Sequence, residues 1–133
     1  MPSPSTKNCP CGSGAPYAEC CGPIHERGAG LGTQAEQLMR ARYSAYVLND
    51  IDFLLRSWHP DSRPAELSLE AGQSWQGLTI VETVGGSGME QAGIVEFIAR
   101  FSRGGEDFEL HERSSFARVG GKWQYIDGVD PST

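Results

Sequence analysis

The apolar positions of the chain first follow a helical period, from about residue 33 to Asn49. The stretch Thr33-Gln34-Ala35-Glu36 predicts the start of this helix as a capping box, in which the threonine hydroxyl and the glutamate carboxylate each bind a free backbone amide. One face is apolar and the other polar, with Ala35, Leu38, Met39 and Tyr46 on the first and Glu36, Gln37, Arg40, Ala41 and Ser44 on the second. Arg42 is an exception, because it lies within the apolar face. A second, short helix is expected after Asn49 or Asp50, ending before Pro60.

From Ser74 onward the apolar residues alternate with polar ones, which is typical of half-buried strands. Glycine pairs at 85–86, 104–105 and 120–121 separate four predicted antiparallel strands, at about 74–84, 90–103, 106–118 and 122–128. The alternation puts Phe108, Leu110, Glu112, Ser114 and Phe116 on one face of the third strand, and Trp123, Tyr125 and Asp127 on one face of the fourth. Helices followed by an antiparallel meander predict an α+β domain with the helices packed on one sheet face.

Length and charge narrow the class of protein. A chain of 133 residues is expected to form one domain with a small appendage. A net charge of -6 argues against nucleic-acid binding, which depends on lysine and arginine contacts to phosphates. No apolar run approaches the length of a membrane span, and the first eight residues lack the apolar core of a signal peptide. We therefore expect a cytoplasmic protein.

All four cysteines, Cys9, Cys11, Cys20 and Cys21, fall within thirteen residues. Four thiolates supply the soft tetrahedral ligand set of a structural zinc ion, with no open position for catalysis. A disulfide framework would need an oxidising compartment, and a redox pair is more often Cys-x-x-Cys. We expect zinc, with reduced or redox-active thiols as the alternative. His25 follows closely enough to be a substitute ligand, but we expect it to be solvated within a connection at 23–32.

The run from Cys9 to Gly22, with Cys-Pro-Cys-Gly-Ser-Gly, Tyr17 and Cys20-Cys21-Gly22, resembles the SEC-C zinc motif at the carboxyl end of the SecA translocation motor. The segments that follow it resemble the YchJ-like family of bacterial proteins, from Leu38-Met39-Arg40-Ala41-Arg42-Tyr43-Ser44-Ala45-Tyr46 through Trp58-His59-Pro60, Val95-Glu96-Phe97 and His111-Glu112-Arg113-Ser114-Ser115-Phe116 to Trp123-Gln124-Tyr125. The resemblance implies a nuclear-transport-factor-2-like cone preceded by a SEC-C knuckle. It implies no established activity.

These inferences predict a domain order. We expect a disordered tail at 1–8, the SEC-C zinc knuckle at 9–22, the connection at 23–32, the cone at 33–128 and a second tail at 129–133. The cone implied by the resemblance has an interior pocket. Polar side chains on its apolar faces would hold a ligand there. The candidates are Arg42, Glu112, Ser114 and Asp127, together with Trp58 and Tyr125.

Arg42 is expected to need a carboxylate, because an unpaired buried guanidinium is costly. Glu112 is the first candidate partner and Asp127 the second, whereas His111 and Arg113 have the opposite parity and should point away from the pocket.

Three functions fit these patterns. The first is an adaptor, in which the zinc knuckle presents a surface to a partner protein. The second is small-molecule binding or enzymatic activity in the pocket, with Glu112 or Asp127 as general base and Arg42 holding an anion. In the third, the charges only pair and the knuckle only folds. The sequence contains no nucleophile–base arrangement or phosphate loop, so catalysis is the less favoured possibility.

Overall fold

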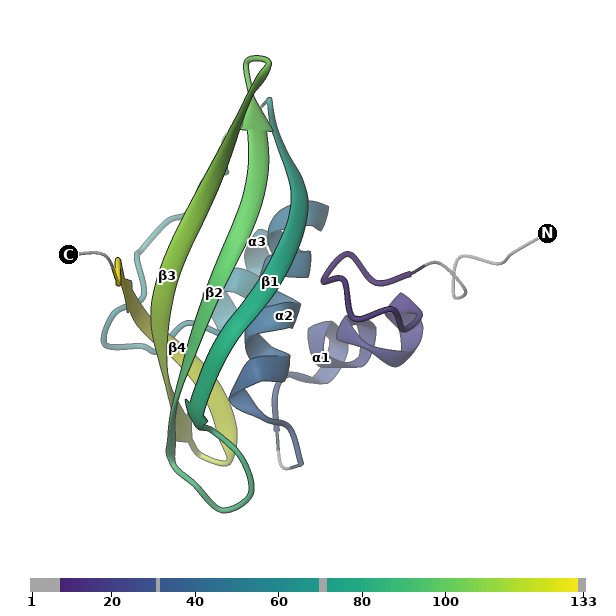
Figure 1. The fold of residues 1–133 in the computed structure, drawn as a ribbon. Coiled ribbons are helices and arrows are strands. Elements are labelled where there is room, and N and C mark those ends of the chain that lie inside the picture. The colour runs from purple at the N-terminus through teal and green to yellow at the C-terminus, as the bar shows by residue number, and fades with distance from the viewer. Residues whose placement is uncertain (1–7, 31, 70–71, 132–133) are drawn as a thin grey trace.

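The structure, a computed structural model, describes residues 8–30, 32–69 and 72–131. Its four strands form one antiparallel sheet in the order β1-β2-β3-β4, with β1 at Gln73–Gly85, β2 at Ala92–Arg103, β3 at Glu106–Val119 and β4 at Lys122–Val129 (Figure 1). Every strand end lies within two residues of its predicted position. The expected tail at 1–8 falls outside the described residues except for Asn8, and the one at 129–133 does so only at 132–133, since Val129 is the last residue of β4.

The helices precede the sheet. They are the short 3-10 helix η2 at Tyr17–Glu19, then α1 at Cys21–Arg27, α2 at Ala35–Leu48 and α3 at Ile51–Arg56. The prediction of a connection at 23–32 is wrong for its first residues, which continue α1. This helix ends at Gly28, whose φ of 86° is available to glycine at little cost. No helix among the described residues is long and apolar enough to cross a membrane.

The N-terminal caps of α2 and α3 differ in how well the sequence predicted them. Asp50 caps α3 as expected, since its side chain accepts a hydrogen bond from the Phe53 amide. The capping box of α2 is one residue later than predicted. Gln34 is the cap, in extended conformation, and its backbone N–H donates to Oε1 of Gln37 at 2.7 Å. Thr33 cannot serve, because its backbone lies before the helix, where its carbonyl accepts from the Trp123 indole at 2.8 Å.

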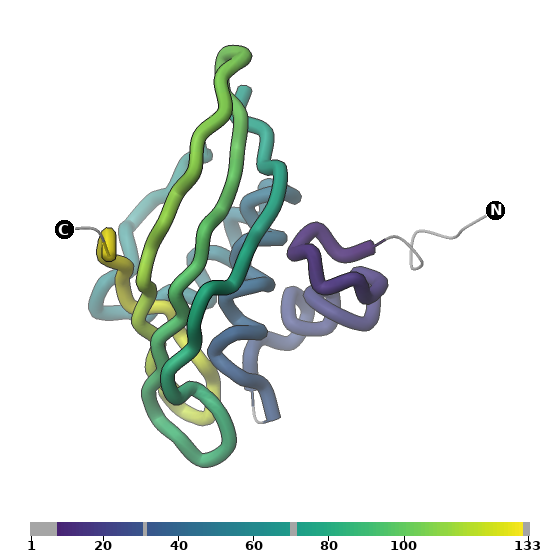
Figure 2. The backbone as a smooth tube through the Cα atoms, viewed as in Figure 1, coloured from purple at the N-terminus to yellow at the C-terminus, as the bar shows by residue number. Residues whose placement is uncertain are grey.

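Helix α2 is covered on both sides, by the sheet on one and by the cysteine-rich segment with α1 on the other (Figures 1 and 2). Its predicted polar face is therefore partly wrong. Ala41 and Ser44 are both fully buried, because the cysteine-rich segment packs onto them. The cysteines belong to the same core cluster as the apolar face of α2, so the appendage and the cone share one core.

The inner face of the sheet carries the main core. Phe97, Phe116 and Trp123 are buried there, as the strand alternation predicts. The prediction for Asp127 is wrong, because a bulge lies between β3 and β4. Tyr125 pairs with Phe116, but Asp127 pairs with Ser115, the residue before Phe116, so one residue is inserted in β4 and the alternation reverses. Asp127 is consequently exposed and does not face the interior.

Candidate functional site

The sulfur atoms of Cys9, Cys11, Cys20 and Cys21 all lie within 4.8 Å of one another. All four cysteines are free, and the Cys11 and Cys20 sulfurs are 3.6 Å apart. That separation far exceeds a disulfide bond of about 2.05 Å. It is close to the roughly 3.8 Å between two sulfurs bound tetrahedrally to zinc at about 2.3 Å. The prediction that these four cysteines come together is confirmed, and their arrangement fits a metal ion.

Two short segments bring the four cysteines together. The Cys9 amide donates to the Ala15 carbonyl at 2.8 Å, which closes the loop that holds the first two cysteines. Gly12 and Gly14 lie within this loop at φ values of 80° and 86°, a conformation that residues with a Cβ rarely adopt. The other two cysteines lie at the junction of η2 and α1, where Cys21 is the first residue of the helix.

Hydrogen bonds to the sulfurs come from two sources. Ser44 of α2 donates to the Cys21 sulfur at 3.3 Å, and its hydroxyl lies 3.5 Å from the Cys9 sulfur. The Ser13 hydroxyl lies 3.2 Å from the Cys20 sulfur. Ser44 was not predicted as part of the site, because a small polar residue in a helix resembles an ordinary surface position. Its contacts show that the cone supplies part of the surroundings of the cysteines.

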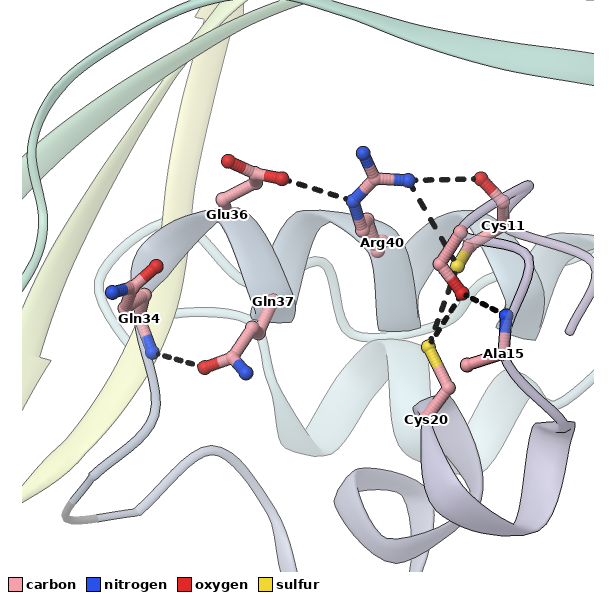
Figure 3. Close-up of polar contacts among 8 residues, drawn as sticks. Cys11, Ala15, Cys20, Gln34, Glu36, Gln37 and Arg40 are labelled. Carbon is pink, nitrogen blue, oxygen red and sulfur yellow. Dashed lines mark hydrogen bonds and ion pairs between the residues drawn. The ribbon is translucent and has the colours of Figure 1, made fainter.

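Arg40 adds a positive charge beside the cluster. Its guanidinium donates to the Cys11 carbonyl at 3.1 Å, lies 4.0 Å from the Cys11 sulfur, and pairs with Glu36 at 3.0 Å (Figure 3). Four thiolates and one divalent ion leave a net charge of about -2. Arg40 would offset part of that charge if an ion is bound.

Without a metal ion the cluster cannot hold four thiolates. The hydrogen bond from Cys21 lowers the pKa of Cys11, and the same bond together with burial raises the pKa of Cys21. Burial likewise raises the pKa of Cys20. A bound cation would remove this competition, because it would stabilise every thiolate at once.

His25 is buried, so the prediction of a solvated histidine is wrong. Its Nε2 lies 2.7 Å from the Ala41 carbonyl and its Nδ1 lies 2.6 Å from the Tyr17 hydroxyl. Since a carbonyl only accepts, Nε2 carries the proton and Nδ1 accepts from the tyrosine. His25 thus joins η2, α1 and α2, and it is not a member of the cysteine cluster.

A second candidate site lies between α2 and the inner face of the sheet, where a cavity of about 190 Å³ opens. Arg42, Glu112, Ser114 and Tyr125 line it, as predicted from their faces. Trp58 does not line the cavity, but the centre of its ring lies 4.9 Å from the guanidinium carbon of Arg42. Asp127, exposed beyond the bulge, is not among the lining residues.

Arg42 does not pair with Glu112, so that prediction is wrong. Its Nη1 donates to the Leu54 carbonyl at 2.9 Å and to the Ser57 hydroxyl at 2.7 Å. Its guanidinium also lies 4.3 Å from the centre of the Tyr125 ring. Among the described residues, no carboxylate lies within ion-pair distance of it. Burial lowers the pKa of Arg42 to about 10. The Leu54 carbonyl, the Ser57 hydroxyl and the aromatic faces of Trp58 and Tyr125 thus take the place of the expected carboxylate. The sequence alone does not predict that the Leu54 carbonyl would face Arg42.

Glu112 is held apart from Arg42 by its own contacts. It accepts a hydrogen bond from Ser114 at 3.4 Å, and burial raises its pKa. A Cβ at Gly128 would lie only 2.5 Å from its Oε2, so the carboxylate occupies space that only glycine leaves free. On the opposite face of the sheet His111 and Arg113 both bind Glu96, at 2.8 Å each, and they point away from the cavity as predicted.

Known proteins share both parts of the chain. Residues 34–128 match the family described as the middle, NTF2-like domain of YchJ, and residues 6–23 match the SEC-C motif. A UPF0225 protein from Streptomyces coelicolor is 48% identical over 128 residues, covering 96% of this chain and 97% of the relative. A UPF0225 protein from Xanthomonas campestris is 46% identical over 129 residues, covering 95% and 97%.

Two solved structures have the same fold. A SEC-C motif containing protein from Rhodopseudomonas palustris superposes with a TM-score of 0.79 at 34% identity, covering 93% of this chain and 98% of that one. A SEC-C motif containing protein from Psychrobacter arcticus superposes with a TM-score of 0.74 at 26% identity, covering 93% and 82%. The similarity therefore extends over the appendage and the cone together.

Proposed function

The chain belongs to the YchJ-like UPF0225 family, and from that premise we propose that it is a zinc-binding adaptor whose SEC-C knuckle, residues 9–22, binds a partner protein. The observation that carries the proposal is the convergence of four free cysteine sulfurs within 4.8 Å on the appendage. Such a site holds zinc with all four positions filled, so its role is structural.

The chemistry of the ligands favours zinc over other common ions. Thiolates are soft ligands, which zinc binds well and which magnesium and calcium bind poorly. Iron also accepts four cysteines, and direct metal analysis distinguishes the two ions. Because Cys9, Cys11 and Cys21 are buried, a bound ion would be shielded from solvent on the side of α2.

The partner surface that we propose lies on the knuckle and the first turns of α1. A shallow groove of about 300 Å³ lies there, lined by Tyr17, Ala18, Gly22, Pro23, His25 and Glu26. Gly22 keeps this surface compact, because a Cβ at that position would lie 2.8 Å from the Tyr17 carbonyl oxygen. Glu26 of the groove lining is exposed, and Glu19, which directly follows the lining residue Ala18, is exposed as well, so a positively charged segment of a partner protein would complement this surface.

Metal analysis of the protein purified under reducing conditions tests the zinc site. We expect one zinc ion per chain, and loss of the ion from the Cys20→Ser variant. A reduced and folded protein that contains neither zinc nor iron, and that binds neither when it is added, would contradict the proposal.

A charge-reversal variant tests the partner surface separately. We expect Glu19→Lys with Glu26→Lys to retain zinc but to lose cross-linked partners that the wild-type protein captures. The matched control is Glu66→Lys with Glu106→Lys, which changes the net charge equally at exposed positions outside the groove. Partners lost from both variants, or retained by both, would show that this groove is not the binding surface.

A further inference from the structure

We propose that the cavity between α2 and the sheet binds a small, neutral, single-ring molecule that carries an N–H donor beside a carbonyl acceptor. This binding site is distinct from the cysteine cluster and needs no metal ion. Its size sets the first limit, because a cavity of about 150 Å³ accommodates benzene and this one measures about 190 Å³. One ring with one or two polar substituents fills it.

The polar groups at the cavity define the hydrogen bonds of the ligand. Arg42 and Glu112 both line the space, but they do not contact each other. A guanidinium only donates hydrogen bonds, and an ionised carboxylate only accepts them. A ligand that spans the two therefore presents an acceptor to Arg42 and a donor to Glu112, an arrangement that a cyclic amide provides on adjacent atoms.

Both groups are held in place before a ligand arrives. Nη1 of Arg42 is fixed by the Leu54 carbonyl and the Ser57 hydroxyl, at 2.9 and 2.7 Å. Glu112 is fixed by Ser114 and by the space left free at Gly128. Pre-organised groups of this kind favour binding, because little side-chain entropy is lost when the ligand enters.

The walls favour a flat ring. Trp75 lies against Tyr43 and Tyr46 with ring centres 5.8 Å apart in each pair, and all three rings line the cavity. Aromatic walls with a few fixed polar groups are typical of small-molecule sites. The cavity is not sealed from solvent, since Leu110, one of its lining residues, is 37% exposed.

The charges at the cavity favour a neutral molecule. The positive charge of Arg42 and the negative charge of Glu112 cancel, so an uncharged ligand leaves the balance unchanged. A ligand carboxylate would be attracted by Arg42 but repelled by Glu112. A ligand cation would be attracted by Glu112 but repelled by Arg42. The shape and charge of the cavity thus distinguish a cyclic amide from an aromatic acid of the same size.

Titration of the full-length, zinc-loaded, nitrogen-15-labelled protein with three probes tests this proposal by nuclear magnetic resonance. We expect 2-pyridone to shift the Trp75 indole resonance in a saturable way. N-methyl-2-pyridone, which lacks the donor, should bind about tenfold or more weakly, because a hydrogen bond to a charged group is lost. Benzoate should also bind about tenfold or more weakly than 2-pyridone.

Two variants on one strand locate the site. Glu112→Met should weaken 2-pyridone binding about tenfold or more, whereas Glu109→Met, at an exposed position outside the cavity, should not change it. Dispersed spectra establish that both variants fold, and the probe comparison on the wild-type protein remains decisive if Glu112→Met does not. Absence of a 2-pyridone shift, equal binding of its N-methyl analogue, tighter binding of benzoate, or equal effects of the two variants would each overturn the proposal.

Discussion

The Ser44→Ala variant offers a stringent test of how the cone supports the metal site. Ser44 is fully buried on α2, and its hydroxyl donates to the Cys21 sulfur at 3.3 Å and lies 3.5 Å from the Cys9 sulfur. With zinc bound both sulfurs are thiolates, so the hydroxyl stabilises negative charge at the site. We expect the substitution to weaken zinc binding while the fold is retained.

The expected magnitude follows from the type of hydrogen bond that is lost. A hydrogen bond to a charged group contributes about 1.5 to 3 kcal/mol, which corresponds to about 10- to 100-fold in affinity. Loss of a hydrogen-bond partner of a metal ligand commonly has an effect of this size. Alanine has the best helix propensity, so α2 itself should not be weakened.

Competition for zinc with a chromophoric chelator, at fixed pH and under reducing conditions, measures the effect. The matched control is Ser114→Ala, since Ser114 is equally buried but its hydroxyl donates to Glu112, away from the cysteines. The control should bind zinc as tightly as the wild-type protein. Unchanged zinc affinity of Ser44→Ala, or an equal decrease in both variants, would refute the reasoning.

Three further predictions concern stability. Phe116→Ala should lower the free energy of unfolding in urea by about 3 to 5 kcal/mol, since Phe116 is 1% exposed, and Phe108→Ala should lower it less, since Phe108 on the same strand face is 40% exposed; equal losses would contradict the difference in burial between the two rings. Burial raises the pKa of folded Glu112, so the wild-type protein loses stability as pH rises through that pKa. Glu112→Gln should therefore be more stable than wild type at pH 7 but not below pH ~4, and a pH-independent difference would count against this. Chelation of zinc should lower the thermal midpoint of the whole protein, because the cysteines share the core of α2, and two separate transitions would argue otherwise.

Local patterns in the sequence are sufficient for the elements and for the cysteine cluster. The glycine pairs mark the turns, and strand alternation assigns Phe97 and Phe116 to the core, because both signals depend on residues close together in the chain. The cysteine cluster can be predicted for the same reason, since all four cysteines lie within thirteen residues of one another in the chain. The α+β class then follows from the order of helices and strands.

Tertiary structure decides which surfaces are covered and which side chains meet. Ala41 and Ser44 have the spacing of an outer face, and they are buried only because the cysteine segment packs onto them. One inserted residue in the β3–β4 pairing turns Asp127 outward, and no pattern in the sequence predicts this bulge. Arg42 obtains the Leu54 carbonyl of α3 and the hydroxyl of Ser57, the residue after α3, in place of the expected carboxylate. These outcomes depend on contacts between distant segments, and periodicity describes only one segment at a time.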